Sequence, residues 1–342
     1  MKKTILIIST LLLFVTTSII TAEAKVTIKI AGIAPKGSAP MVLLEEMKNK
    51  IKEVTNNEVH FKIYPGGIQG DEKDVITKIK LGQLHGGAFT SVGLGRIVPE
   101  IRVTDIPFLF KNYEEVEYVR AKLKNKLEKF MDEKGFVVIA WSDIGFAHTF
   151  SKEPINRDNL KDLKVWVWGD DVLSNTVWKT LGVTPVALSI TDVLTSLSTR
   201  LIDTAATTPF GAVAFRWYKK FNYISEIPST NPSSAIIVTK KQWQKITPES
   251  RKKINEVADW YQEKLTKSTR KANADCLQIL KKSGIKIAPV SDEGIAFVTD
   301  MQLRTREALV GKLYTRELLN ETLRHLDDYR QVHPESDYQR IQ

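Results

Sequence analysis

Short strand-like segments alternate with helix-like segments along residues 25–91, and this alternation restricts the fold more than any other feature of the sequence. The strand-like segments are rich in β-branched residues, whereas the helix-like segments carry apolar residues at helical spacing. The expected order is strand, helix, strand, helix, strand, over residues 25–32, 41–55, 58–67, 71–84 and 85–91. Such an order is typical of an α/β domain with a largely parallel sheet.

A second α/β set follows further along the chain. A helix at 112–135 and a strand at 136–143 complete the first set. In the second set, strands are expected at 163–169 and 183–188 and helices at 170–182 and 189–203. A strand or turn is expected to follow at 204–210. Residues 254–284 read as one unusually long helix, which we expect to run across both sets as a framework.

The expected parallel strands also indicate where a ligand would bind. In open α/β sheets, ligands lie outside the carboxyl ends of the strands. The loops that follow Ile30, Tyr64 and Phe89 are therefore the first places to look for a binding site.

Residues 1–24 have the organisation of a secretory signal peptide. A basic start precedes a largely apolar stretch at 5–20, and Ala22-Glu23-Ala24 matches a small-x-small cleavage site. The apolar stretch is shorter and more interrupted by Ser and Thr than a membrane span of about 20 residues. We expect export and cleavage after Ala24; retention of the segment as an anchor is the alternative.

Composition excludes several classes of site. The sequence holds one cysteine, Cys276, so no internal disulfide is possible, and its five histidines show no metal-ligand spacing. The formal net charge is +10, but Lys and Glu mix along the expected helices, as in "EEMKNKIKEV". We interpret these charges as solvated helix faces and expect no nucleic-acid partner.

Catalytic signatures are missing from the sequence. It has no G-x-S-x-G elbow, the glycine-rich stretch "YPGGIQGDEK" lacks the G-K-[ST] ending of a phosphate loop, and "GLGR" lacks the third glycine of a dinucleotide fingerprint. The acid pairs Asp170-Asp171 and Asp132-Glu133 are interpreted as structural. We therefore expect no enzymatic activity, no cofactor and no metal.

Four stretches of the sequence occur in an order that resembles a known family. They are "YPGGIQGDEKDVITKIKLGQLHGG", "VTDIPFLF", "PINRDNLKDLKVWV" and "LGVTPVALSITDVLTSLSTRLID", at 64–87, 103–110, 154–167 and 181–203. Together they resemble the periplasmic solute-binding (P) subunits of TRAP transporters, and the resemblance covers nearly the whole chain after the signal segment.

The resemblance implies the fold class of an α/β, two-domain, periplasmic-binding-protein-like clamp with mixed, mainly parallel sheets. A long framework helix crosses both domains, and the two domains close on a ligand about a hinge. The first domain is expected at 25–145 plus about 232–272, and the second at 146–231 plus about 273–330. Residues 331–342 are expected to form a polar, frayed tail.

The resemblance also implies which positions face the ligand. In this family a strand Leu-Lys-Ile-Arg-Val-Pro presents an arginine that grips a carboxylate through two parallel hydrogen bonds. Trp166 stands at that arginine position, and strand alternation places Trp168 on the same face. Ala147 takes the place of a second family arginine, and Thr208 replaces an asparagine before proline. An unpaired carboxylate in a closed cleft costs several kcal/mol, so a C4-dicarboxylate or sialic acid is a poor ligand.

We therefore expect a hydrophobic or amphipathic small ligand in an interdomain cleft. The candidate ligand-binding residues are Trp166, Trp168, Phe146, Ala147, Phe89, Phe108, Ile190, Thr208, Phe210 and Trp217. Core packing is the alternative role for the aromatic residues, Phe108 above all. A cation relocated to Arg96, Arg102 or Lys111 is a second alternative, with an acid that carries a long apolar tail as the ligand.

The same resemblance implies a place and partners. A protein of this kind works in the periplasm and delivers its ligand to the membrane permease subunits of a TRAP transporter. Some relatives also work with a periplasmic partner built from tetratricopeptide (TPR) repeats, and we include such a partner as an expectation. The alternative from another class is a non-transporting interaction scaffold whose cleft is filled permanently by Trp166 and Trp168.

Overall fold

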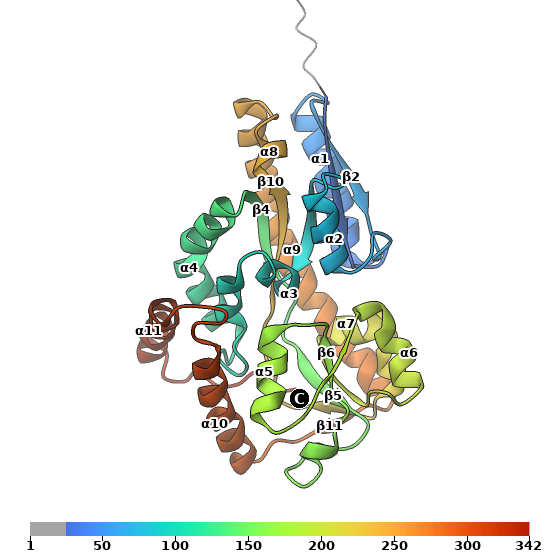
Figure 1. Cartoon of the computed structure of the whole chain (residues 1–342), viewed down its shortest axis with the longest axis vertical. Coiled ribbons are helices and arrows are strands. Elements are labelled where there is room, and N and C mark those ends of the chain that lie inside the picture. The colour runs from blue at the N-terminus through green and yellow to red at the C-terminus, as the bar shows by residue number, and fades with distance from the viewer. Residues whose placement is uncertain (1–24, 342) are drawn as a thin grey trace, which may run out of the picture.

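A computed structural model describes residues 25–341 (Figure 1). The expected signal peptide lies outside these described residues. Within them, no helix combines the length and the hydropathy that a membrane crossing requires.

The first domain is built on a five-stranded sheet in the order β2-β1-β3-β10-β4. Its strands are β1 (Val26–Gly32), β2 (Val59–Tyr64), β3 (Gly86–Thr90), β4 (Phe136–Asp143) and β10 (Ser233–Thr239). β1 pairs parallel with β2 and β3, whereas β10 pairs antiparallel with β3 and β4. The expected strands along 25–91 are therefore present, and a strand from much later in the chain enters between β3 and β4.

Helices cover both faces of this sheet. They are α1 (Ala39–Val54), α2 (Glu72–Lys80), α3 (Ser91–Gly95), the 3₁₀ helix η1 (Pro99–Asp105), α4 (Tyr113–Glu133) and α8 (Lys240–Trp243). Along β10, Ile236 and Val238 enter the core under α1, while Ala235 and Ile237 enter the core under α4. A strand buried on both faces reads as a continuous apolar run, which is what β10 shows.

The second domain holds a four-stranded sheet and a separate two-stranded one. The four strands, in the order β11-β9-β5-β8, are Lys286–Ala288, Tyr223–Ser225, His148–Ser151 and Thr204–Thr207. The pair is β6 (Trp166–Trp168) with β7 (Val186–Leu188). Around them lie α5 (Val172–Thr180), α6 (Val193–Ser198), α7 (Pro209–Ala214) and the 3₁₀ helices η2 (Leu160–Asp162), η3 (Ile190–Asp192) and η4 (Trp217–Lys220).

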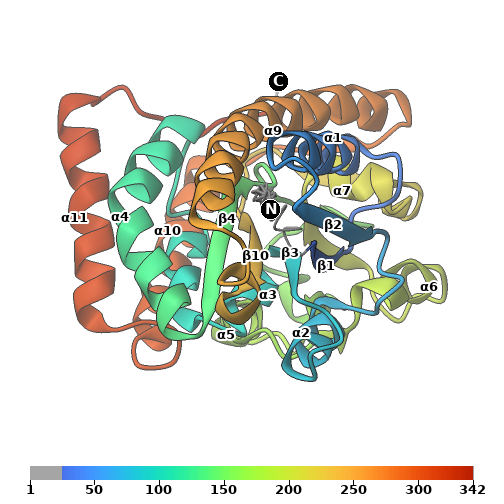
Figure 2. The ribbon, with the colours of Figure 1, turned by 90° about the horizontal axis from the view of Figure 1, so that it is seen from above.

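One helix of 35 residues, α9 (Pro248–Lys282), connects the two domains. It packs against α1 and β4 of the first domain and against α7 of the second, and Figure 2 shows it lying beside α1. The expectation of a long helix that crosses both domains is confirmed. The two-domain α/β class with mixed sheets is confirmed as well, although antiparallel pairings are as frequent as parallel ones and the sheets are not mainly parallel.

Two chain segments cross between the domains beside each other. The backbone N–H of Ala147 donates to the carbonyl of Thr230, and the N–H of Ser229 donates to the carbonyl of Ala147, each at 2.8 Å. Gly145 precedes this crossing with φ of +88°, and a Cβ there would lie 2.3 Å from Nδ2 of Asn273. Only glycine fits this position without strain.

The C-terminal region departs from the expected domain boundaries. α10 (Asp292–Leu309) packs against α5, as expected for the second domain, but α11 (Arg316–Val332) packs against α4 and η1 of the first. The expectation that residues 273–330 belong to the second domain is thus wrong for α11. Its buried Leu318, Leu319 and Leu326 join the core under α4, a contact that no local pattern specifies.

The expectation of a frayed tail is also corrected. The N–H of Gln339 donates to the carbonyl of Lys111 at 2.8 Å, and the N–H of Ile341 donates to the carbonyl of Glu226 at 3.0 Å. The Ile341 side chain is buried. The tail therefore lies across the boundary between the first domain, at Lys111, and the second, at Glu226.

Candidate ligand site

A cavity of about 300 Å³ lies between the two domains. The first domain lines it with the loop after β1, the end of β3, α3, η1 and parts of α1 and α9. The second domain lines it with β6, α5, the end of β8, α7 and η4. Of the three loops expected from strand order, those after Ile30 and Phe89 reach the cavity, whereas the loop after Tyr64 contributes no lining residue.

The structure brings eight of the ten candidate residues to this cavity. They are Phe89, Ala147, Trp166, Trp168, Ile190, Thr208, Phe210 and Trp217. The alternation argument for β6 holds in the structure, because the Trp166 and Trp168 rings lie on one side of the strand with centroids 6.0 Å apart.

Phe146 does not line the cavity. Adjacent residues of an extended segment point to opposite sides, so Ala147 takes the cavity side and Phe146 the other. The buried Phe146 ring packs against the Tyr113 ring at a centroid distance of 4.8 Å.

Phe108 also lies outside this cavity. It has a left-handed backbone conformation, with φ of +55°. Its N–H donates to the carbonyl of Ser229 at 2.7 Å, so the backbone turns the ring toward the core under α4 instead of the cavity. Phe108 packs against that core and also lines a second cavity, separate from this one.

Tryptophan rings form one wall of the cavity. The Trp166 and Trp217 rings meet edge to face at 5.2 Å, and Phe215 stacks on Trp217 at 5.4 Å. The indole N–H of Trp166 donates to the carbonyl of Leu188 at 3.1 Å. Because that polar group is satisfied by the neighbouring strand, Trp166 offers the cavity an apolar ring surface.

Trp168 reaches the first domain. Its indole N–H donates to both carboxylate oxygens of Asp71, at 3.0 and 2.9 Å. The hydroxyl of Ser189 donates to the same carboxylate at 2.7 Å. Asp71 is the N-cap of α2, so two side chains of the second domain hold a helix start of the first.

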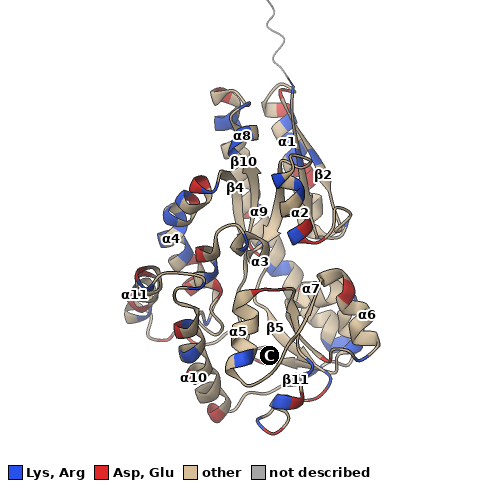
Figure 3. Cartoon of the chain, in the orientation of Figure 1, with Lys and Arg blue, Asp and Glu red and all other residues tan. Residues whose placement is uncertain are grey.

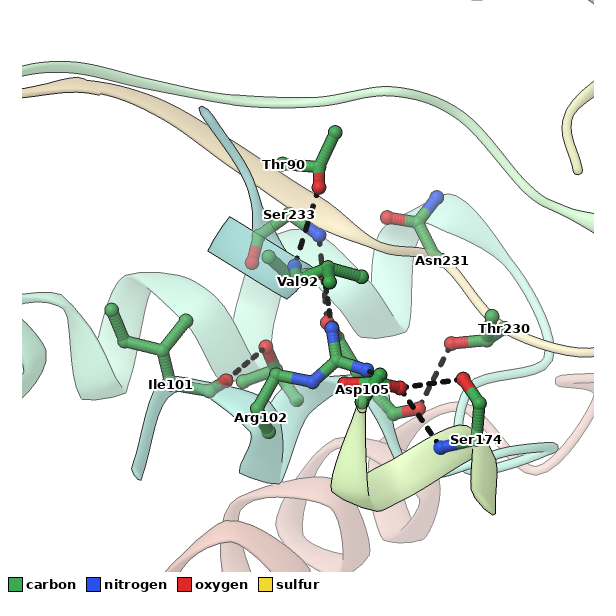
Figure 4. Close-up of polar contacts among 12 residues, drawn as sticks. Thr90, Val92, Ile101, Arg102, Asp105, Ser174, Thr230, Asn231 and Ser233 are labelled. Carbon is green, nitrogen blue, oxygen red and sulfur yellow. Dashed lines mark hydrogen bonds and ion pairs between the residues drawn. The ribbon is translucent and has the colours of Figure 1, made fainter. Parts of the chain in front are cut away.

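Arg102 is the only Lys or Arg that lines the cavity in the described part of the chain. Its guanidinium lies 3.0 Å from Asp105, donates to Asp171 at 3.1 Å and donates to the Ser91 hydroxyl at 2.9 Å. Figure 4 shows Arg102 beside Asp105, with Ser174 of α5 next to them. Arg102, Asp105 and Asp171 are all buried.

Electrostatically, this cluster gives the cavity no excess positive charge. Two carboxylates face one guanidinium, and burial raises the pKa of Asp105 although the charges of Arg102 and Arg120 oppose that shift. Asp171 also caps α5 by accepting from the backbone N–H of Ser174 at 2.9 Å. The arginine thus joins η1 of the first domain to α5 of the second.

The other two cations considered in the sequence lie elsewhere. Arg96 pairs with Asp170, an exposed residue next to the buried cluster. The Lys111 ammonium donates to the carbonyl of Ser336 in the C-terminal tail at 3.0 Å. Neither residue lines the cavity.

Several lining residues have no signal in the sequence. Met41 and Leu44 of α1, Trp178 of α5 and Tyr261 of α9 read there as ordinary core positions of amphipathic helices. Only the docking of the helices turns these faces toward a shared space. The hydroxyls of the lining have no signal either: Thr90, Ser91, Ser142, Ser174, Thr207, Thr230 and Ser234.

Reactive groups do not gather at this cavity. His148 is buried, and its Nδ1–H donates to the carbonyl of Ser225 at 2.9 Å. It lies outside the lining, and burial lowers its pKa to about 4. Among residues 25–341, no group of His, Cys, Asp and Glu is arranged to hold a metal ion. The arrangement of this cavity suits binding.

Comparison with known proteins agrees with this fold. The family model for bacterial extracellular solute-binding proteins of family 7, DctP, matches residues 30–308. A protein of Chromohalobacter salexigens described as a solute-binding protein is 27% identical over 276 residues, which is 78% of this chain and 79% of that protein.

Two solved structures show the same fold. A TRAP periplasmic solute-binding protein of Desulfovibrio salexigens, with bound orotic acid, has a TM-score of 0.83 at 21% identity and covers 89% of this chain and 99% of its own. Another such protein, from Chromohalobacter salexigens with bound D-glucuronate, has a TM-score of 0.79 at 23% identity. The match covers 88% of this chain and 99% of that one. The chain therefore belongs to family 7 of the bacterial extracellular solute-binding proteins, the DctP family of periplasmic TRAP receptors.

Proposed function

We propose that this TRAP receptor captures an apolar or amphipathic small molecule between its two domains. Proteins of the family are periplasmic, bind ligands without catalysing reactions and deliver them to membrane permease subunits. The observation that carries the ligand class is the pairing of a tryptophan-rich wall with a single arginine whose charge two carboxylates already balance.

A ligand carboxylate would meet an unfavourable field in this cavity. It would approach Arg102, but also the buried carboxylates of Asp105 and Asp171 that contact the same guanidinium. Burying a charge without a free partner costs several kcal/mol. Apolar groups, in contrast, gain about 25 cal/mol for each Å² removed from water against Trp166 and Trp217.

Hydroxyl groups give the cavity a polar side, so the ligand is best described as amphipathic. Thr90 and Ser91 lie near Arg102, and Thr208 lies at the start of α7. These groups suit neutral polar atoms of a ligand, such as hydroxyl or carbonyl oxygens. The aromatic wall suits its apolar body.

A second candidate is an organic acid that uses Arg102. Two observations favour it: Arg102 lines the cavity, and solved relatives carry bound D-glucuronate and orotic acid. Because burial raises the pKa of Asp105, its neutral form would leave more of the guanidinium charge for a ligand carboxylate.

The remaining space argues against the scaffold with a filled cleft. Trp166 and Trp168 lie along the wall, and a cavity of about 300 Å³ persists beside them. The TPR partner stays a prediction that no feature of the described chain tests.

The test combines native mass spectrometry of the exported protein with thermal-shift measurements on dodecanoate, dodecanol, D-glucuronate and orotate. We expect a co-purified apolar molecule and stabilisation by dodecanol. Dodecanoate should stabilise less, because its carboxylate meets those of Asp105 and Asp171, and D-glucuronate and orotate should not stabilise at all. Trp166→Arg should abolish both the co-purification of a ligand and the stabilisation by added compounds. Trp141→Arg is the matched control, because Trp141 lies outside this cavity and its indole N–H donates to Glu128 at 3.0 Å, where arginine can pair.

The outcomes separate the candidates. Stabilisation by D-glucuronate or orotate, with none by dodecanol, would establish the acid that uses Arg102. An empty protein that none of the four compounds stabilises would establish the scaffold, and capture of a protein partner would then be the next experiment.

A further inference from the structure

A second cavity, of about 460 Å³, is lined mainly by the second domain, with Pro107 and Phe108 of the first domain at its edge. Its floor is one face of the four-stranded sheet, and its roof is formed by α5 and α10, which pack against each other (Figure 1). Residues 155–160 close one side. We call this space the second chamber, to distinguish it from the interdomain cavity.

Strand alternation explains why the second chamber exists. In β5, Phe150 points into the core on one face of the sheet, whereas Thr149 and Ser151 point into the chamber. In β9, Ile224 enters the same core and Ser225 the chamber. Large side chains therefore fill one face of this sheet, while the small side chains of the other face leave space beneath the helices.

The roof of the second chamber is apolar. α5 contributes Val177 and Trp178, and α10 contributes Phe297, Val298 and Met301. The charged residues of the lining, Arg157 and Glu293, are exposed and mark the outer rim. The Arg157 guanidinium lies over the Phe297 ring at 5.4 Å, so its charge stays at the surface while the ring faces inward.

The second chamber and the interdomain cavity share a wall. The residues common to both linings are Leu173, Ser174, Trp178, Ala206 and Thr230. Ala206 is exposed although it lies within β8, because its methyl group faces this space. These residues therefore border both spaces.

We propose that the second chamber holds the apolar tail of an elongated amphipathic ligand whose polar end lies in the interdomain cavity near Arg102. This inference rests on the proposed function and specifies its ligand class: a molecule with one polar end and a straight apolar chain that passes Trp178. An interdomain cavity of about 300 Å³ is at the small end for ligand sites, which span about 300–1,000 Å³. The second chamber would add its apolar space to that of the interdomain cavity.

The test is a calorimetric titration with straight-chain carboxylates from hexanoate to hexadecanoate and the matching alcohols. In the unmodified protein, each added methylene should tighten binding about fourfold until the chamber is full. Ala288→Phe fills the chamber from β11, and Leu160→Trp fills it from η2, outside the sheet. Either variant should weaken the longest ligands at least about tenfold while hexanol binding stays within about twofold.

Ala187→Phe is the matched control, because Ala187 is exposed on β7 and lines neither space. It should bind the whole series as the unmodified protein does. An unchanged length dependence in both filled variants, each folded by its melting temperature, would overturn the second-chamber proposal alone. Failure of every acid and alcohol to bind the unmodified protein would overturn the proposed ligand class and the chamber together.

Discussion

Trp168 and Asp71 join the two domains directly: the indole N–H of one donates to both carboxylate oxygens of the other, at 3.0 and 2.9 Å. The two residues lie 97 positions apart in the chain. A tryptophan expected as a cavity wall or a core residue is thus also a contact between the two domains.

Replacing this tryptophan should favour the open arrangement. A hydrogen bond to a charged group contributes about 1.5–3 kcal/mol, so Trp168→Phe should weaken binding of a ligand that needs closure about tenfold or more. Small-angle X-ray scattering should show a larger radius of gyration for the unliganded variant. Trp141→Phe, which removes the Glu128 hydrogen bond outside the cavity, should change neither quantity. Equal scattering curves for Trp168→Phe and the unmodified protein would count against a role in closure.

Arg102 should matter for stability more than its neighbour Arg96 does. Arg102→Met leaves the buried carboxylate of Asp171 without its cation and leaves Asp105 with only Arg120, at 4.0 Å, which we expect to cost about 3–5 kcal/mol of unfolding free energy. Arg96→Met breaks an exposed pair with Asp170 and should cost at most about 1 kcal/mol. Urea denaturation of both variants measures the difference; similar losses would refute the buried-cluster interpretation.

Stability should fall with rising pH because of Glu72. Burial raises the pKa of this carboxyl from 4.5 to about 8. Hydrogen bonds from Thr90 act to lower this pKa, and the charge of Asp71 acts to raise it. The folded state therefore keeps a proton that the unfolded state loses. The stabilisation is complete below about pH 4.5 and declines until about pH 8.

The variant Glu72→Gln isolates this effect, since the amide does not titrate. The free energy of unfolding of the unmodified protein should fall by a few kcal/mol relative to the variant across that pH range. Chemical denaturation at a series of pH values measures it. Parallel stability curves for the two proteins would show that Glu72 is ionised in the folded state at neutral pH.

Gly145→Ala should destabilise the crossing between the domains. The substitution adds a methyl group 2.3 Å from Nδ2 of Asn273, which donates to the carbonyl of Ile144 at 3.1 Å, and it strains a backbone at φ of +88°. Gly284→Ala has a similar φ of +90° with no atom near the added group. We expect a loss of about 1 kcal/mol for Gly284→Ala, from backbone strain alone, and a clearly larger loss for Gly145→Ala. Thermal unfolding compares the two, and equal losses would show that Asn273 moves aside freely.

The charge pattern agrees with the sequence interpretation. Figure 3 shows Lys and Arg distributed with Asp and Glu along the helices of the first domain. Ion pairs such as Lys264 with Glu46, between α9 and α1, combine the two signs.

What the sequence by itself determined is local. Apolar periodicity and β-branched runs predicted β1, β2, β3 and β4 of the first sheet, though not β10, together with the long helix α9 and the shared face of Trp166 and Trp168. Such patterns depend on residues a few positions apart. Phe146 was misplaced because adjacent positions of an extended segment cannot both face one cavity. A left-handed turn at Phe108 keeps its ring out of the interdomain cavity and places it beside the second chamber.

Tertiary structure alone decided the rest. The Arg102 contact with Asp171 spans 69 positions, and α11 meets α4 only after the chain has crossed both domains. The second chamber exists because small side chains on one face of a sheet lie beneath large ones on separate helices, and the interdomain cavity exists because two domains contribute its walls. Such contacts carry no local signal, since each partner is an ordinary buried or polar residue until docking brings them together.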